Sequence, residues 1–350
     1  MSQAFDVSVV LPMYNVRNYV AEALDSLISQ TLQNIQIIFV DDGSTDGSAD
    51  IVRAYQMKDP RIQLIHQENA GAALARNTGL DAAQADYVMF LDPDDAFHPE
   101  LCEKLLAKAW ATDADLCFCG AYDFVDSVRQ ATSRAGSYTK LAQRIFATRQ
   151  VALAGQLPKS LYQMTNPAPW NKIYRKAFLL DEGIRFQNLR NANDLFFYIA
   201  ALASAKRIAS VPEDLVYYRN ARAGGAQLGR EKHPCEFAKA LTAGYEFLCE
   251  TGRLTQCEHS FCRLLITHVR YNLKGPVSFG SFQQAYNAAK TLLERVFQEH
   301  PDRLQHLGEP GRALVDAMLA LDAAEYLHAE WKTIPDLKEE LAAAKAAAGL

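Results

Sequence analysis

The first third of the chain alternates short apolar runs with segments of helical periodicity. Four apolar runs predict strands, at residues 7–11, 35–40, 62–65 and 87–91. Between them, apolar residues recur at helical spacing from Val16 to Gln30, and an alanine-rich helix is expected over 71–83. Strands that alternate with helices are typical of an open parallel sheet covered by helices on both faces.

The pattern changes along the rest of the chain. A helix is expected over 99–112 and a strand over 116–119, and the alternation then lapses between 122 and 163. Further on, the pattern predicts a helix over 194–205 and strands over 208–211 and 215–218. From 231 to 350 the pattern is helical, and it ends in a helix rich in Ala, Glu and Lys. An α/β domain over 1–229 and a helical C-terminal region over 230–350 are therefore expected.

Composition narrows the class of protein. The 350 residues are 49% hydrophobic and 22% charged, as in soluble globular proteins. Lys and Arg number 36 and Asp and Glu 41, so the formal charge is −5 and nucleic acid is not an expected partner. The N-terminus lacks the features of a secretory signal, and the longest apolar run, 195–205, is shorter than the about 20 residues that span a bilayer. We expect a cytoplasmic protein, with any membrane contact peripheral and at the inner face of the cell membrane.

The seven cysteines are an odd number scattered over the chain, which favours reduced thiols over a disulfide framework. Cys and His residues between 235 and 268 lack the paired spacing of a zinc site.

Polar residues follow three of the predicted strands, at 12–15, 41–44 and 92–95, where ligands bind in open parallel sheets. Asp92, Asp94 and Asp95 would repel one another unless water, a cation or a donor group compensates them. A divalent cation, Mg²⁺ or Mn²⁺, would do so and would also hold the phosphates of a nucleotide diphosphate. The alternatives are a solvated acidic turn, or a phosphatase with Asp92 as nucleophile, although Ala96 stands where that motif has Thr.

Four motifs, in order and with matching spacing, resemble those of the family 2 glycosyltransferases. They are Val7-Ser8-Val9-Val10-Leu11-Pro12-Met13-Tyr14-Asn15, Val40-Asp41-Asp42-Gly43-Ser44-Thr45-Asp46-Gly47-Ser48, Asn69-Ala70-Gly71 with Ala75-Arg76-Asn77-Thr78-Gly79, and Phe90-Leu91-Asp92-Pro93-Asp94-Asp95. The resemblance implies a GT-A fold, which is a Rossmann-like, mostly parallel sheet flanked by helices, here with a helical C-terminal extension. It also implies a nucleotide-sugar half over about 1–120, an acceptor half over about 121–229, and inversion at the anomeric carbon.

The resemblance also assigns the donor site residue by residue. Donor-binding residues are expected at Pro12, Tyr14, Asn15, Asp42, Arg76, Asn77 and Asp92. The divalent metal is assigned to Asp94, with Asp92 and Asp95 as further ligands.

The second half of the resemblance concerns the catalytic base. Residues 169–175 and 183–186 are similar to the segment that, in bacterial members making surface polysaccharides, precedes a Glu-Asp pair opening an aromatic helix. Here that pair is Asn193-Asp194, so the resemblance implies Asp194 as the base, while a helix N-cap is the structural alternative. Arg219 or Arg222 is expected at the leaving diphosphate, unless both are ordinary surface arginines.

The function implied is inverting, metal-dependent transfer of a hexose or N-acetylhexosamine from a UDP-sugar to a hydroxyl of a cell-surface glycan, such as capsule or lipopolysaccharide. The acceptor is expected to be a glycan or a lipid-linked glycan. Asn193 in place of Glu leaves open a weakly active or inactive nucleotide-sugar-binding protein of the same fold. In the helical region, Leu327 and Trp331 are expected in the core or at a membrane or partner contact.

Overall fold

The computed structural model describes residues 5–125, 127–134, 138–220, 230–276 and 278–330. The chain divides into two compact units. The α/β unit consists of Met1–Leu189 and Asn193–Arg222, and the helical unit consists of Arg190–Ala192 and Ala223–Leu350. The domain boundary expected at 229 lies outside the described residues.

The α/β unit is built on one mixed sheet, whose strand order is β3-β2-β1-β4-β8-β6-β9-β5, with β7 paired to β6. The strands are β1 (Val7–Met13), β2 (Ile35–Asp41), β3 (Ile62–His66), β4 (Tyr87–Phe90), β5 (Ala96–Phe97), β6 (Leu116–Phe124), β7 (Thr132–Ser133), β8 (Lys172–Arg175) and β9 (Ile208–Arg219). β1 is parallel to β2 and β4, and β2 is parallel to β3. The parallel half predicted from the apolar runs is therefore confirmed.

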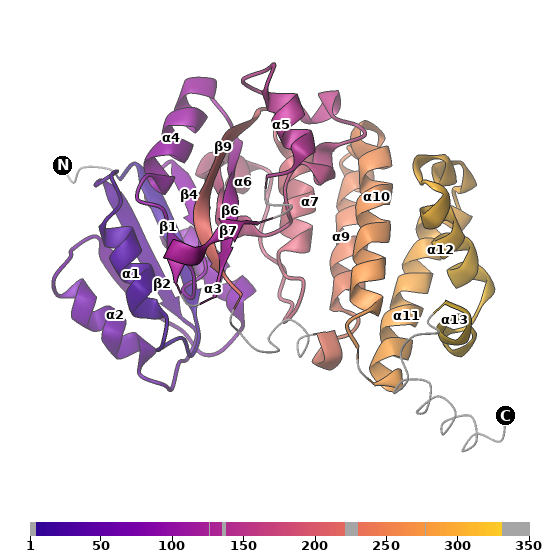
Figure 1. Cartoon of the computed structure of the whole chain (residues 1–350), viewed down its shortest axis with the longest axis horizontal. Coiled ribbons are helices and arrows are strands. Elements are labelled where there is room, and N and C mark those ends of the chain that lie inside the picture. The colour runs from indigo at the N-terminus through magenta and orange to yellow at the C-terminus, as the bar shows by residue number, and fades with distance from the viewer. Residues whose placement is uncertain (1–4, 126, 135–137, 221–229, 277, 331–350) are drawn as a thin grey trace. The chain divides into compact units, whose positions relative to one another are not determined.

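Helices flank this sheet (Figure 1), and every residue of β1, β2 and β4 is buried. The helices are α1 (Val20–Ile28), α2 (Ser48–Gln56), α3 (Ala72–Ala82), α4 (Leu101–Thr112), α5 (Lys140–Phe146), α6 (Lys176–Asp181) and α7 (Leu195–Ser204). α3 lies close against β1, because a Cβ on Gly79 would stand only 2.2 Å from Cγ1 of Val10. Continuous burial explains why these strands read as apolar runs rather than as alternating patterns.

The second half of the sheet is mixed, and one of its strands differs from the sequence prediction. β8 is antiparallel to both β4 and β6, and β6 is parallel to β9. β9 is one strand of 12 residues where two strands were expected. Its register against β6 shifts on either side of Gly120, where a Cβ would stand 1.9 Å from Oδ1 of Asp214. The polar residues near 213 therefore lie at a bulge within one strand, not in a turn between two.

The lapse predicted between 122 and 163 contains β7, α5 and single turns of 3₁₀ helix. These turns are Val128–Gln130, Ala154–Gln156 and Leu161–Gln163, and another follows at Pro169–Asn171.

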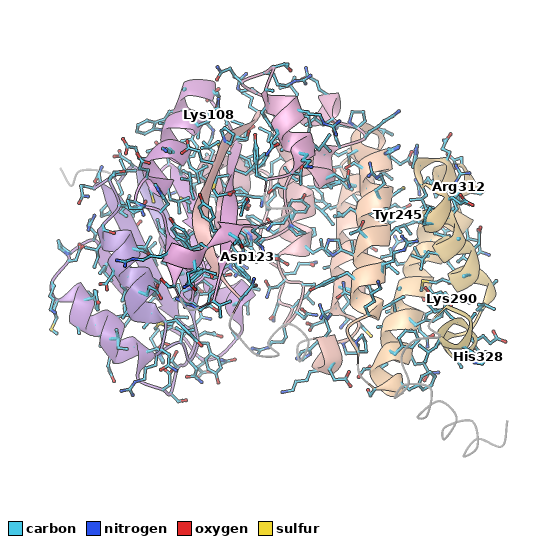
Figure 2. All side chains as sticks on the ribbon, viewed as in Figure 1. Lys108, Asp123, Tyr245, Lys290, Arg312 and His328 are labelled. Carbon is cyan, nitrogen blue, oxygen red and sulfur yellow. The ribbon has the colours of Figure 1, made fainter. Side chains whose placement is uncertain are left out.

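The helical unit confirms the helical pattern of the C-terminal region. Its elements are α9 (Glu236–Glu250), α10 (Leu254–Leu273), α11 (Phe279–Leu293), a π-helical turn (Glu294–Gln298), a 3₁₀ segment (Pro301–His306), α12 (Glu309–Ala320) and α13 (Ala323–Glu330). Tyr245, labelled on α9 in Figure 2, is buried and accepts a hydrogen bond of 2.8 Å from Arg303. Leu327 is fully buried, whereas Trp331 and the expected terminal helix lie outside the described residues.

No helix in the described ranges has both the length and the apolar character needed to cross a bilayer. All seven cysteines are free thiols, and five of them are buried.

Candidate active site

The loops after β1 and β2 are joined at the carboxyl edge of the sheet. Asn15 adopts a positive φ of 51°, and its side-chain oxygen accepts a hydrogen bond of 2.9 Å from the Thr45 backbone N–H. The Asn15 backbone N–H donates in return to Oγ of Ser44 at 3.1 Å. Pro12 is buried within β1, whereas Tyr14 is 50% exposed. The structure therefore brings the predicted residues of these two motifs to one edge and gives the Asn15 amide a role in holding the loops together.

Asp42 connects the loop after β2 to the loop before α3. One carboxylate oxygen accepts hydrogen bonds of 2.8 Å from the Gln67 side chain and the Ala70 backbone N–H, and the other accepts one of 2.8 Å from the Gly71 backbone N–H. The side chain is almost completely buried. Its assignment to donor binding stays a prediction, and the contacts present show that it fixes the loop around Ala70.

Arg76 on α3 is the centre of the site. Its Nη2 donates to Oδ1 of Asp92 at 2.8 Å, and its Nη1 donates to Oδ1 of Asn193 at 3.1 Å. The guanidinium carbon lies 5.4 Å from the centroid of the Phe186 ring. The side chain is only 8% exposed, so its charge acts at reduced solvent screening. The buried guanidinium of Arg76 thus joins the acidic run after β4, at residues 92–95, to Asn193 before α7.

Asn77, the next residue on α3, has a different partner. Its amide donates to the Phe186 carbonyl at 2.8 Å, and its carbonyl oxygen accepts from the Phe186 backbone N–H at 3.0 Å. The Phe186 ring stacks on Phe197 of α7, with centroids 4.0 Å apart, and packs edge-on against Phe90 of β4. Lining of the nucleotide pocket by Asn77 stays a prediction. The contacts present show that Asn77 and this aromatic cluster fix α3, β4 and α7 against one another.

The acidic run after β4 forms a turn that Arg219 holds in place. The Arg219 backbone N–H donates to Oδ1 of Asp95 at 2.9 Å, and its Nε donates to the Asp94 carbonyl at 2.8 Å. Its remaining guanidinium nitrogens donate to the Val125 carbonyl and to the Glu22 carboxylate. Contact of Arg219 or Arg222 with the leaving diphosphate stays a prediction. The Arg219 side chain is buried among these partners and shapes the turn at 92–95, so it is not an ordinary surface arginine. Arg222 lies outside the described residues.

The three carboxylates of that turn have unequal environments. Asp92 pairs with Arg76, and Asp94 is half-buried. Asp95 is buried with no hydrogen-bond partner for Oδ2, and burial, followed by the nearby Asp92 and Asp94 carboxylates, raises its pKa well above the usual value.

Asp92, Asp94 and Asp95 fit a metal ion for which the protein supplies only some of the ligands. Across the described ranges, no three His, Cys, Asp or Glu side chains form a closed metal cage. Mg²⁺ and related ions commonly take one or two carboxylates and complete their shell with substrate phosphates and water. The orphaned Asp95 oxygen and the half-buried Asp94 suit such an open site, which would form only when the donor diphosphate is bound.

Asp194 immediately precedes α7, in the position of a helix cap, yet its side chain makes no capping hydrogen bond. Burial raises the pKa of its carboxyl above the usual value, and the Asp92 carboxylate raises it further, whereas Arg76 and Lys172 lower it. A carboxylate that is half-buried, not used by the helix and has an elevated pKa has the properties of a general base.

Lys172 is a residue of this region whose setting the sequence did not predict. Its side chain is fully buried, and its ammonium donates to the carbonyls of Asn166 and Ala168 and to Oδ1 of Asn171, at 2.6–2.8 Å. Burial lowers its pKa to about 7, while the Cys119 thiol and Asp194 act in the opposite direction. The only signal in the sequence was its place in the 169–175 segment, since its acceptors are mostly backbone carbonyls.

Known glycosyltransferases are similar to this chain in sequence and in fold. Residues 8–177 match the profile described as glycosyl transferase family 2. EpsH of Bacillus subtilis (strain 168), named as a glycosyltransferase, is 29% identical over 320 residues, which cover 89% of this chain and 88% of EpsH. TuaG of the same organism, named as a teichuronic acid biosynthesis glycosyltransferase, is 45% identical over 115 residues, which cover 33% of this chain and 46% of TuaG.

Among solved structures, S. aureus TarS in complex with UDP-GlcNAc superposes with a TM-score of 0.73 at 20% identity. The superposition covers 92% of this chain and 89% of the solved chain, which is TarS 1–349, and it confirms the GT-A-like fold with a helical C-terminal region. With the four motifs in order, the matching fold and the profile match over residues 8–177, this chain belongs to glycosyltransferase family 2.

Proposed function

We propose that this enzyme transfers a hexose or N-acetylhexosamine from a UDP-sugar to a hydroxyl of a cell-surface glycan, with inversion at the anomeric carbon. The TarS complex with UDP-GlcNAc supports a UDP-sugar donor, and the name of TuaG supports an acceptor in a surface polysaccharide. Transfer at the cytoplasmic side of the membrane suits a lipid-linked acceptor.

The observation that carries this proposal is the double contact of Arg76. Its guanidinium joins Asp92, beside the candidate diphosphate site, to Asn193, beside the candidate base. An inverting transfer needs the leaving group and the base on opposite sides of one reacting carbon. A rigid link between the two sites is what such a geometry requires.

In the proposed reaction, the acceptor oxygen forms a bond to the anomeric carbon while the bond from that carbon to the UDP oxygen breaks. The acceptor proton moves to the carboxylate of Asp194, and the electron pair of the broken bond leaves with UDP. A divalent ion held by Asp94, with Asp92 or Asp95, would neutralise the charge of the diphosphate. Arg219 keeps the Asp94 turn in place, and Arg76 offsets the negative charge that faces Asp194.

Donor and metal are tested by UDP release from a panel of UDP-, GDP- and dTDP-sugars with Mn²⁺, Mg²⁺ or EDTA. The expected result is turnover with a UDP-sugar that EDTA abolishes and added Mn²⁺ or Mg²⁺ restores. Asp94→Asn should lower turnover by at least about 100-fold. Asp86→Asn is the matched control, because Asp86 is an exposed carboxylate at the opposite end of β4. Full turnover in EDTA, or in Asp94→Asn, would reject the metal assignment.

The alternative is nucleotide-sugar binding without catalysis, which Asn193 in place of the family's Glu motivates. It predicts that wild type binds a UDP-sugar in calorimetry but releases no UDP with any glycan acceptor. Acceptor-dependent UDP release would eliminate it.

A further inference from the structure

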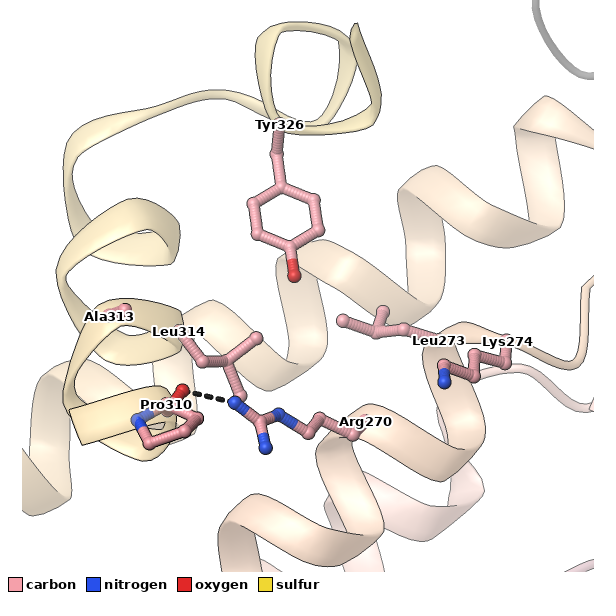
Figure 3. Close-up of a pocket in the computed structure, with 7 residues that line it drawn as sticks. All are labelled: Arg270, Leu273, Lys274, Pro310, Ala313, Leu314 and Tyr326. Carbon is pink, nitrogen blue, oxygen red and sulfur yellow. Dashed lines mark hydrogen bonds between the residues drawn. The ribbon is translucent and has the colours of Figure 1, made fainter. Parts of the chain in front are cut away.

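A pocket of about 420 Å³ opens on the helical unit (Figure 3), and none of its lining residues belongs to the candidate active site. It is lined by Arg270, Leu273, Lys274, Pro310, Ala313, Leu314 and Tyr326. This volume falls within the range of about 300–1,000 Å³ typical of small-molecule sites. α10, α12 and α13 each contribute to it, so the packing of three helices fixes its shape.

The floor of this pocket is apolar and preformed. Leu273 and Leu314 are buried beneath it, and Tyr326 is 3% exposed with its ring against Tyr286. In Figure 3 the Tyr326 hydroxyl points toward the space between the two leucines. Apolar groups of a ligand would therefore meet a fixed surface and would order few side chains on binding.

The rim of the pocket is positively charged. Arg270 and Lys274 are exposed, one helical turn apart, and no acidic side chain is among the lining residues. Arg270 donates to the Pro310 carbonyl, a neutral acceptor that leaves its charge uncompensated. Within the described ranges, neither cation pairs with a carboxylate. Two such cations stand out on a chain whose net charge is −5.

We infer that this pocket binds a phosphate ester that carries an apolar chain. The phosphate lies between Arg270 and Lys274, where a guanidinium and an ammonium both donate charge-assisted hydrogen bonds. The apolar chain packs on Leu273, Ala313 and Leu314. An uncharged lipid would leave both cations unused, and a purely hydrophilic phosphate would leave the apolar floor uncovered.

The same chemistry has two sources, a free isoprenyl phosphate or the headgroup of a membrane phospholipid, and binding measurements on the full chain distinguish them. One arm titrates geranyl phosphate, inorganic phosphate and geraniol by calorimetry. The other arm measures sedimentation with vesicles of phosphatidylcholine alone or mixed with phosphatidylglycerol. We expect geranyl phosphate, or the mixed vesicles, to bind at least about tenfold more tightly than the probes that lack the phosphate ester or the chain.

Two kinds of variant locate the binding. Arg270→Gln with Lys274→Gln should weaken it at least about tenfold. The matched control, Arg263→Gln with Lys239→Gln, removes the same charge from exposed positions of α10 and α9 and should change it less than about twofold. Ala313→Glu places a carboxylate at an exposed lining position and should weaken binding while both cations remain.

Three results would overturn the inference. They are no binding of any probe to wild type, equal losses in the pocket and control variants, or undiminished binding in Ala313→Glu. In those cases the two cations would serve only the carboxyl end of α10, where basic residues are favourable. The assays contain no sugar nucleotide, so their outcome is independent of the proposed transferase activity.

Discussion

Arg76 decides how charge is distributed around Asp194. Its guanidinium contacts Asp92 and Asn193 and lowers the pKa of the Asp194 carboxyl, against the effects of burial and of Asp92. Lys172 acts in the same direction as Arg76 from β8. Because Asn193 is neutral, Arg76 is not shared with a further carboxylate at that position.

The charge at position 193 should therefore set the pH dependence of catalysis. A base must be deprotonated, so kcat/KM falls as pH drops through the pKa of Asp194. Asn193→Glu adds a carboxylate that competes for Arg76 and should move this acid limb to higher pH. Asn193→Gln, which keeps the amide, should leave the limb in place. An unchanged or lowered limb in Asn193→Glu, measured as a pH profile of kcat/KM, would refute this role of the residue.

The sequence predicted which motif residues would gather at the site, because these residues follow strands that end at the same edge of the sheet. Pro12, Asp42 and Asp92 lie where the parallel strands β1, β2 and β4 bring them. The hydrogen-bond partners of individual side chains could not be predicted from the sequence. Asn77 binds the backbone of Phe186, which is 109 residues away, and no local pattern encodes such a contact.

At the scale of elements, the close approach of α3 to β1 positions Arg76. Gly79 lies one turn after Arg76 on the face of α3 that meets Val10. Only a residue without a Cβ allows α3 to lie this close to β1. Any separation of helix and strand would therefore also move the Arg76 guanidinium.

Gly79→Ala should lower the free energy of unfolding of the α/β unit by about 1–3 kcal/mol, because the added methyl group clashes with Val10. Urea unfolding measures this change, and adding Val10→Ala should recover part of it. Gly280→Ala is the matched control, since a Cβ there meets nothing within 4 Å. Equal stability of Gly79→Ala and wild type would contradict the packing described.

β9 shows where pattern reading fails for an element. Pro212-Glu213-Asp214 has the composition of a turn, and the sequence therefore predicted two strands. Pairing with β6 keeps the chain extended across these residues, and Gly120 makes room for Asp214. The pairing that overrides the turn tendency is with β6, about 90 residues earlier in the chain, so the local sequence pattern could not predict it.

At the scale of the whole molecule, the seven thiols differ in how far they are exposed to solvent. Cys249 is exposed and Cys235 is half-buried, whereas the other five thiols are buried. Burial raises the pKa of Cys102 and of Cys262 to about 12, so these thiols stay protonated at neutral pH.

Alkylation of the native protein should therefore modify Cys249 first and Cys235 more slowly. Cys102, Cys117, Cys119, Cys257 and Cys262 should react only after unfolding. Peptide mapping by mass spectrometry after timed iodoacetamide treatment reads this order. Rapid labelling of Cys117 or Cys119 would show that the sheet is less protected than its burial indicates.

The assignment of Asp194 as the base of a UDP-sugar transferase is tested most directly by kinetics of Asp194→Asn beside Asp181→Asn, an exposed control at the end of α6. The measurement is acceptor-dependent UDP release, with UDP affinity determined on the same preparations. Asp194→Asn should lose at least about 100-fold in kcat while its UDP affinity stays within about twofold, and Asp181→Asn should match wild type. Retention of wild-type kcat in Asp194→Asn would contradict the assignment.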